Sequence, residues 1–411
     1  MPSPGEVGFR SAVAVGEFRA LWIAHAQSRL GDQLARVAIS ILVFERTSSA
    51  ALTTVTYALT LLPPLISAPL LSGLADRYSR RAVMVTTEIC RAVVVGVMAL
   101  PWLPLVALAA LLVVIVSLQP LYSAARNAVL PNVLEGESYV TGLSIVTMTD
   151  NFVQVGGFAA GGALVGIIRP RGVLLLDAAT FAVSAAVVFF GVGRHHPQSA
   201  ESTEATVKLS PWSGVKILWT DRRLRYLLGL LYSYGFYIAP EGLASPYAAE
   251  LGLGAVAVGL LMAADPVGAG VGSWLMTRIN ADARERVLAP LAVLSGVPLL
   301  VSSLVPTLPI VLAMWTLTGC LASYTFIAQA LFVQAIPDDR RGRALGLAGA
   351  GLLAAQGLGI AIAGAVADLL TPSAAVGVMG LIGVGVSLLA GQAWNRHHNR
   401  GFIPPARADL D

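Results

Sequence analysis

The sequence predicts an all-α membrane protein in which twelve transmembrane helices form two six-helix halves. An apolar composition, twelve apolar runs of membrane-spanning length, and one long polar interval near mid-chain predict this class. Of the 411 residues, 56% are hydrophobic and 12% are charged, whereas a soluble domain carries about 25% charged residues. Each run reaches the roughly 20 residues that one helical crossing needs. Helices also satisfy their own backbone hydrogen bonds in lipid.

The apolar runs place the crossings in two groups of six. We expect them at residues 18–44, 51–74, 82–101, 103–125, 139–168, 171–193, 225–249, 254–277, 287–305, 308–336, 344–370 and 373–394. The chain then divides into an N-terminal tail (1–17), a first half (18–193), a linker (194–224), a second half (225–394) and a C-terminal tail (395–411). No cleavable signal peptide is expected, because the apolar run at the N-terminus is short.

The linker has two parts of different composition. Its first part is rich in Ser, Thr, Glu and His, which is typical of disorder. Its second part, Trp212 to Arg225, carries Trp and aliphatic residues at helical spacing with basic residues elsewhere. We expect this part to form an amphipathic helix on the membrane surface.

The basic residues set the expected orientation, because Lys and Arg are retained on the cytoplasmic side. With both termini cytoplasmic, that side holds 21 of the 27 basic residues, the opposite loops hold three, and Arg29, Arg36 and Arg91 lie inside helices. We therefore expect a multi-pass protein of the inner (plasma) membrane with both termini in the cytoplasm. The net charge of +4 reflects this topology, so the expected partner is the lipid bilayer and not nucleic acid. We expect a monomer.

Two glycine pairs recur in the two halves. Gly156 and Gly161 in the fifth run match Gly359 and Gly364 in the eleventh at an offset of 203 residues. A duplicated six-helix unit with a binding site between the halves is a recurrent transporter design. The alternative is that these glycines only let helices pack closely.

A charged loop between the second and third runs resembles a known family signature. Residues 70–81 read LLSGLADRYSRR, with Ser72 and Ser79 where the family has glycine. The residues that match the signature loop of the major facilitator superfamily are Leu74, Ala75, Asp76, Arg77, Arg80 and Arg81. The resemblance implies the major facilitator fold. It also implies a conformational latch, formed by Asp76, Arg77, Arg80 and Arg81, that holds the cytoplasmic side shut.

Four further stretches resemble the drug-efflux branch that includes macrolide exporters and the enteric siderophore (enterobactin) exporter. They are EFRALWIAHAQSRLGDQLARVA, LLLDAATFAVSA, LWTDRRLRYLL and PDDRRGRALGLAGAG. The resemblance covers about residues 18–394. It implies a proton-coupled exporter of amphipathic small molecules, an antiporter that works by alternating access and contributes to multidrug resistance.

The resemblance implies the proton gradient as energy source and no bound cofactor. The chain has no GxxxxGK[ST] phosphate loop for ATP, and we expect no enzyme activity. The paired histidines lie in the expected tails, so no metal site is expected. Two alternatives stay open: a proton-coupled symporter that imports a small molecule, and a non-transporting sensor or assembly protein on the same scaffold.

The first apolar run carries His25, Arg29, Asp32 and Arg36 at spacings of four, three and four. This spacing places them on one helix face. A charge inside a bilayer costs about 3 kcal/mol, so such residues face a cavity and pair with one another. We expect the face to line the substrate cavity, with Asp32 as a proton-coupling candidate. The alternative is an internal salt-bridge ladder that only neutralises buried charge.

Two acids of the second half, Glu241 and Asp265, are further proton-coupling candidates. Each lies deep in an apolar run with no basic neighbour one turn away. This is the setting in which a carboxyl can take up and release a proton. Pro240 precedes Glu241 and predicts a helix break there. For Asp265 the alternative is a structural role at the Asp-Pro kink.

Polar and aromatic residues of two other helices complete the expected cavity. Tyr234 and Tyr237 precede Glu241, and aromatic faces suit planar or cationic amphiphiles, although aromatic residues also gather at membrane interfaces. Helix five contributes Asp150, Asn151 and Gln154.

Glycines in helix five also resemble part of the antiporter motif of the family's drug exporters. They are Gly157, Gly161 and Gly162, with Phe158 in place of proline. We interpret Glu88 with Arg91 as structural pairing, and Asp177 as a charge at a helix N-terminus.

Overall fold

The computed structural model describes residues 4–75, 78–194 and 221–401, and it contains helices and no strand within these ranges. A short helix, α1 (Pro4–Ala14), precedes the first crossing. The helices of the N-terminal half are α2 (Gly16–Thr47), α3 (Ala50–Ala58), α4 (Pro63–Ala75), α5 (Arg80–Met98), α6 (Leu105–Val133) and α7 (Glu137–Gly191).

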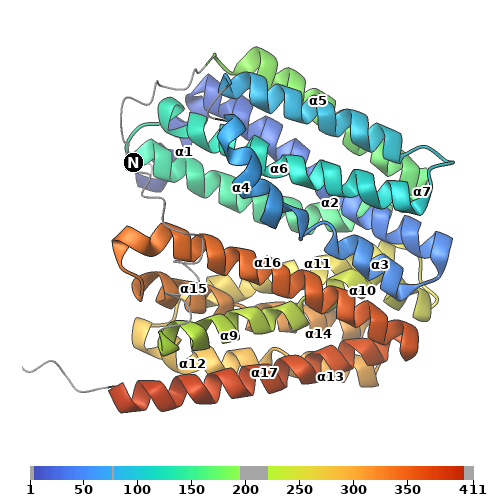
Figure 1. Cartoon of the computed structure of the whole chain (residues 1–411), viewed down its shortest axis with the longest axis vertical. Helices are drawn as coiled ribbons and strands as arrows, with labels where there is room; N and C mark the ends of the chain where they lie inside the picture. Colours follow the sequence, from blue (N-terminus) through green and yellow to red (C-terminus); the bar gives the residue numbers. More distant parts are fainter. Residues whose placement is uncertain (1–3, 76–77, 195–220, 402–411) are drawn as a thin grey trace, which may run out of the picture.

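The C-terminal half contains nine helices among the described residues. They are α9 (Arg222–Tyr237), α10 (Ala239–Glu250), α11 (Ala255–Thr277), α12 (Ala281–Leu294), α13 (Val297–Leu304), α14 (Leu308–Leu321), α15 (Tyr324–Gln334), α16 (Asp338–Leu369) and α17 (Pro372–Gly401). Figure 1 shows this half below the N-terminal half, with the helices of both running in the same general direction.

Several crossings are interrupted, which explains why helices and crossings differ in number. α7 contains two crossings that separate at Arg169, whose φ of 66° and ψ of 163° interrupt the helix before Pro170. A residue that precedes proline is disfavoured in helical conformation. The pairs α3–α4, α9–α10, α12–α13 and α14–α15 each form one crossing in two pieces. The described residues therefore form twelve crossings, which confirms the predicted all-α fold of two six-helix halves.

Eight helical stretches in the described ranges are long and apolar enough to cross a membrane. One of these stretches is α7, which contains two crossings, so the eight stretches account for nine crossings. The three remaining crossings are α2, α5 and α9–α10, which carry Asp32, Arg91 and Glu241, respectively. Of these three charged residues, Arg91 and Glu241 are buried and Asp32 is half-buried.

Some predicted boundaries differ from the observed ones. α6 continues to Val133 instead of ending at 125, so Arg126, which the sequence placed in a cytoplasmic loop, lies inside a helix. The helix continues because residues 124–130 are mostly Ala, Leu and Val with one Arg and one Asn, and Ala, Leu and Arg favour helix. The predicted linker lies outside the described residues at 195–220, and so does most of its amphipathic helix.

The halves meet at the end of the bundle that holds residues 47–50, which we call the closed end. There Asp368 of α16 accepts hydrogen bonds from the Ser49 hydroxyl and from the Ala50 amide, both at 2.7 Å, at the start of α3. A Cβ added at Gly364 would lie 1.7 Å from the Thr54 Oγ1 atom. Figure 1 shows α3 against α10 and α16 at this end.

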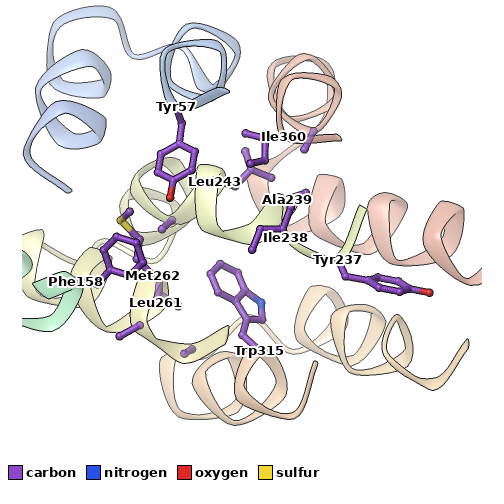
Figure 2. Packing of buried hydrophobic residues seen from close by; sticks show 14 of the residues in the cluster. Tyr57, Phe158, Tyr237, Ile238, Ala239, Leu243, Leu261, Met262, Trp315 and Ile360 are labelled. Carbon is purple, nitrogen blue, oxygen red and sulfur yellow. The ribbon is translucent and has the colours of Figure 1, made fainter. Parts of the chain in front are cut away.

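At a second contact between the halves, the backbones of α7 and α11 touch. A Cβ added at Gly162 would lie 2.5 Å from the Ala255 carbonyl oxygen and 2.8 Å from the Gly259 Cα. Next to it, Phe158 is fully buried. Figure 2 shows its ring beside Met262 and Leu261 of the C-terminal half. Small residues and one aromatic ring therefore join the two halves here.

The glycine contact yields a stability prediction. Gly162→Ala should lower the free energy of unfolding by about 1–3 kcal/mol, because the added methyl overlaps backbone atoms that cannot rotate away. Gly166→Ala is the matched control, since nothing lies within 4 Å of a Cβ at Gly166. Thermal unfolding of the purified protein in detergent measures both. Equal melting temperatures for the two variants would contradict this contact.

Candidate functional site

The charged face of α2 points into the interior of the N-terminal half. His25, Arg29 and Asp32 line a pocket with about 520 Å³ of empty space, together with residues of α5, α6 and α7. Asp32 Oδ1 lies 2.6 Å from Arg91 of α5, and Arg29 lies 3.6 Å from Asp32 Oδ2. This face of α2 forms ion pairs and also lines a pocket. The two alternatives, a salt-bridge ladder and a cavity lining, therefore both apply to these residues.

Asp150 of α7 closes the outer part of this pocket. It lies 3.5 Å from Arg29 and 2.8 Å from His25 Nε2. Asn151 is exposed and Gln154 is half-buried, and neither lines this pocket. Of the three predicted residues of helix five, Asp150 is therefore the one that the structure brings to the charged face of α2.

Arg91 lies at the centre of the buried charges. Its guanidinium contacts Glu88 at 3.1 Å in addition to Asp32, and it stacks on the Phe181 ring at 4.1 Å. Asp177 interacts electrostatically with Arg91 and Asp32 and is 1% exposed. The interpretation of Asp177 as a helix-end charge is wrong, because it lies two turns inside the second crossing of α7 and belongs to this network.

A second pocket, with about 460 Å³ of empty space, adjoins the first. The two pockets share Asp32, Arg91 and Gln119. Arg36 and Asp177 are the other charged residues of the second pocket. Most of its lining is apolar and comes from α2, α5, α6 and α7: Ala35, Ile39, Val95, Met98, Leu112, Ile115, Val116 and Leu174. We call the first pocket the polar pocket and the second the apolar pocket, and the two lie side by side in the N-terminal half.

Sequence reasoning missed the contribution of α6. Gln119, Tyr122, Ser123 and Arg126 all line the polar pocket. Their spacing of three, four and seven residues places them on one helix face. That spacing was visible in the sequence. The signal was overlooked because the predicted crossing ended at residue 125, which left Arg126 in a loop.

A polar contact joins the halves near the apolar pocket. The Tyr57 hydroxyl of α3 donates a hydrogen bond to Glu241 Oε1 of α10. Arg36 of α2 interacts electrostatically with both residues. Glu241 is 5% exposed and follows the break between α9 and α10, which confirms the break predicted at Pro240. Figure 2 shows Tyr57 reaching toward the helix that carries Leu243.

Asp265 of α11 lies in a small pocket inside the C-terminal half. The Tyr234 hydroxyl donates to Asp265 Oδ2 at 2.8 Å, whereas Asp265 Oδ1 and Thr318 Oγ1 are buried and have no hydrogen-bond partner among the described residues. Asp265, Thr318 and Glu241 line this pocket, which has about 220 Å³ of empty space. The two acids of this half therefore face one pocket.

Tyr237 also lines this pocket, and its hydroxyl forms hydrogen bonds with two other helices. Its hydroxyl donates to the Ala292 carbonyl at 2.7 Å and contacts the Ser387 hydroxyl at 2.9 Å. Figure 2 shows the ring pointing away from Glu241's neighbours Ile238 and Ala239. Its hydroxyl therefore links α9 to α12 and α17.

The predicted latch lies partly outside the described residues, at Asp76 and Arg77. Arg80 donates to the Ala128 carbonyl of α6. Arg81 donates to the Val192 carbonyl at 3.2 Å and lies over the Phe189 ring at 4.6 Å. These contacts tie the start of α5 to its neighbours within the N-terminal half. No group of three potential metal ligands occurs in the described ranges.

The charge network yields a second prediction. Arg91→Gln should destabilise the protein by about 3 kcal/mol or more, because it leaves Glu88 buried without its cation and leaves Asp32 with Arg29 alone. Arg222→Gln removes an exposed charge at the start of α9 and is the matched control. Thermal unfolding in detergent measures both changes. An Arg91 variant as stable as the control would show that Arg91 does not hold this network together.

Comparisons with known proteins agree with the fold. A family model described as Major Facilitator Superfamily matches residues 21–283 and 242–408. The chain is 26% identical over 363 residues to the multidrug efflux pump Tap of Mycobacterium bovis and of Mycobacterium tuberculosis, covering 82% of this chain and 84% of each relative.

Solved structures give the same architecture. The crystal structure of the nucleoside transporter NupG matches with a TM-score of 0.71 at 13% identity, covering 91% of this chain and 99% of that chain. A bacterial homologue of the iron transporter ferroportin, in an inward-facing state, matches with a TM-score of 0.67 at 17% identity, covering 92% of this chain and 98% of that chain. The family model spans both halves, and the chain therefore belongs to the Major Facilitator Superfamily of membrane transporters.

Proposed function

We propose that this protein is a proton-coupled exporter of amphipathic small molecules that works by alternating access as a monomer in the inner membrane. The similarity to the multidrug efflux pump Tap supports export. The adjoining polar and apolar pockets support an amphipathic substrate. With both termini cytoplasmic, the closed end faces outward.

The observation that carries the proposal is the contact of Tyr57 with Glu241 across the halves. An ionised carboxylate accepts a stronger hydrogen bond than a neutral carboxyl group does. Protonation of Glu241 therefore weakens a bond between the halves and also removes its attraction to Arg36. The proton occupancy of one side chain is coupled in this way to the stability of the closed end.

Arg36 connects this contact to the substrate. It lines the apolar pocket and interacts with Glu241, Tyr57 and Asp32. An antiporter must not change state when it carries neither proton nor substrate, and an ionised Glu241 that holds the halves together meets this requirement. A substrate that enters the pocket displaces Arg36 from these partners and lowers the barrier to opening outward.

The three acids have different surroundings. Asp32 is ion-paired to Arg91 at 2.6 Å, so its ionised form is held by a cation. Glu241 and Asp265 each accept a hydrogen bond from a tyrosine. We assign proton exchange chiefly to Glu241 and Asp265, and we assign to Asp32 the transmission of substrate binding to Arg91 and Arg29.

Replacement of each acid by its amide tests proton coupling. Glu241→Gln, Asp265→Asn or Asp32→Asn should reduce substrate-induced proton flux in proteoliposomes. We expect a reduction of about tenfold for Glu241→Gln, because a hydrogen bond to a charged group contributes roughly 1.5–3 kcal/mol. Glu135→Gln, exposed between α6 and α7, is the control. Wild-type flux in all three variants would eliminate this assignment.

The direction of transport has its own test. Cells that lack the protein should accumulate more of the fluorescent amphiphile norfloxacin than cells that contain it, because an exporter lowers the internal concentration. Complementation with the Glu241→Gln variant should fail to lower accumulation. If cells that lack the protein instead accumulate less norfloxacin, the protein is an importer.

A further inference from the structure

Arg126 differs from the other arginines of the polar pocket in its partners. Arg29 and Arg91 each lie within 4 Å of carboxylate oxygens. The described contacts of Arg126 are to the neutral Asn127 Oδ1, at 3.3 and 3.1 Å, and to His25 Nδ1. Asp150 interacts with Arg126 only at longer range, and its own contacts are with Arg29 and His25. Among the described residues, the Arg126 charge therefore lacks a carboxylate of its own.

His25 does not change this balance. A guanidinium can only donate hydrogen bonds, so His25 Nδ1 accepts from Arg126. The proton of the ring then lies on Nε2, which donates to Asp150 at 2.8 Å. In this arrangement the imidazole is neutral and holds the Arg126 side chain in place. The acids Asp32, Glu88 and Asp177 gather around Arg91.

Tyr122 provides a second group that a ligand could satisfy. Its side chain is 3% exposed and lines the same pocket, and its hydroxyl interacts with the Ser184 side chain but forms no hydrogen bond of normal distance and angle with the described residues. It lies one turn from Arg126 on the same face of α6, and the two side chains interact electrostatically. A buried polar group without a partner costs about 1–3 kcal/mol. A ligand that accepts hydrogen bonds removes this cost.

We propose that Arg126 and Tyr122 bind an acidic group, such as a carboxylate or sulfonate, of the transported amphiphile. Charge-assisted hydrogen bonds from a guanidinium are among the strongest that proteins form with oxyanions. The adjoining apolar pocket, with Ile39, Met98 and Leu112, accepts the body of the same molecule. The inference rests on the proposed export of amphiphiles and names their class: organic acids and zwitterions.

Two fluorescent xanthene dyes of similar shape and opposite charge test this class. Carboxyfluorescein is anionic and rhodamine 6G is cationic. Fluorescence anisotropy should show that the purified full-length protein in lipid nanodiscs binds carboxyfluorescein more tightly. Arg126→Gln should weaken carboxyfluorescein binding by about tenfold or more, since hydrogen bonds to charged groups are each equivalent to at least a tenfold change in affinity. Rhodamine 6G binding should be unchanged or tighter in this variant.

Further variants separate binding from folding. Arg126→Lys keeps the charge and should retain most of the affinity, whereas Tyr122→Phe should weaken binding of the anionic dye alone. Arg222→Gln, which removes an exposed charge elsewhere, should bind both dyes as the wild type does. Thermal unfolding identifies any variant that fails to fold. If Arg126→Lys and Arg126→Gln are equally stable, the difference between their carboxyfluorescein affinities reports the contribution of the positive charge.

Two results would overturn the proposal. One is equal carboxyfluorescein binding by the wild type and Arg126→Gln, and the other is a wild-type preference for rhodamine 6G. Binding at equilibrium needs no proton gradient, so the outcome is independent of proton coupling. Intact anion binding with no substrate-induced proton flux would reject the proposed coupling and leave this inference standing.

Discussion

The N-terminal half depends on one constraint, which is the cost of keeping a guanidinium inside an apolar bundle. Arg91 is 3% exposed and is surrounded by Asp32, Glu88 and Asp177 from three different crossings. An unpaired charge there would cost several kcal/mol, so α2, α5 and the second crossing of α7 must come together with these side chains aligned. The polar pocket adjoins this cluster, because Asp32 and Arg91 line it together with Arg29 and Arg126.

The two halves treat their polar residues differently. The N-terminal half pairs four arginines with acids or neutral acceptors around adjoining pockets. The C-terminal half has two acids beside a small pocket, with tyrosine hydroxyls as donors. The halves are joined by glycine contacts, by the Tyr57 hydrogen bond and by the hydrogen bonds of Asp368. Contacts of this kind can break without leaving many buried side chains unpaired, which suits a protein whose halves must move.

The sequence was sufficient for the fold and for part of the site. Apolar runs located the crossings, because a helix in lipid needs length and apolarity more than a particular sequence. The spacing of His25, Arg29 and Asp32 predicted one face, and the structure places all three in one pocket. Arg126 was missed because a polar residue at a helix end reads as a loop. The contact of Tyr57 with Glu241 joins residues 184 apart, and no local pattern could pair them.

The hydrogen bonds of Asp368 have a consequence for how the bundle opens. The first backbone amide of α3 has its acceptor on α16, in the other half of the molecule. The free amides at a helix start require acceptors from outside the helix, so separation of the halves uncaps α3. Ser49 still accepts from the Leu52 amide and retains part of the cap. Opening of the closed end therefore includes the hydration of a helix end.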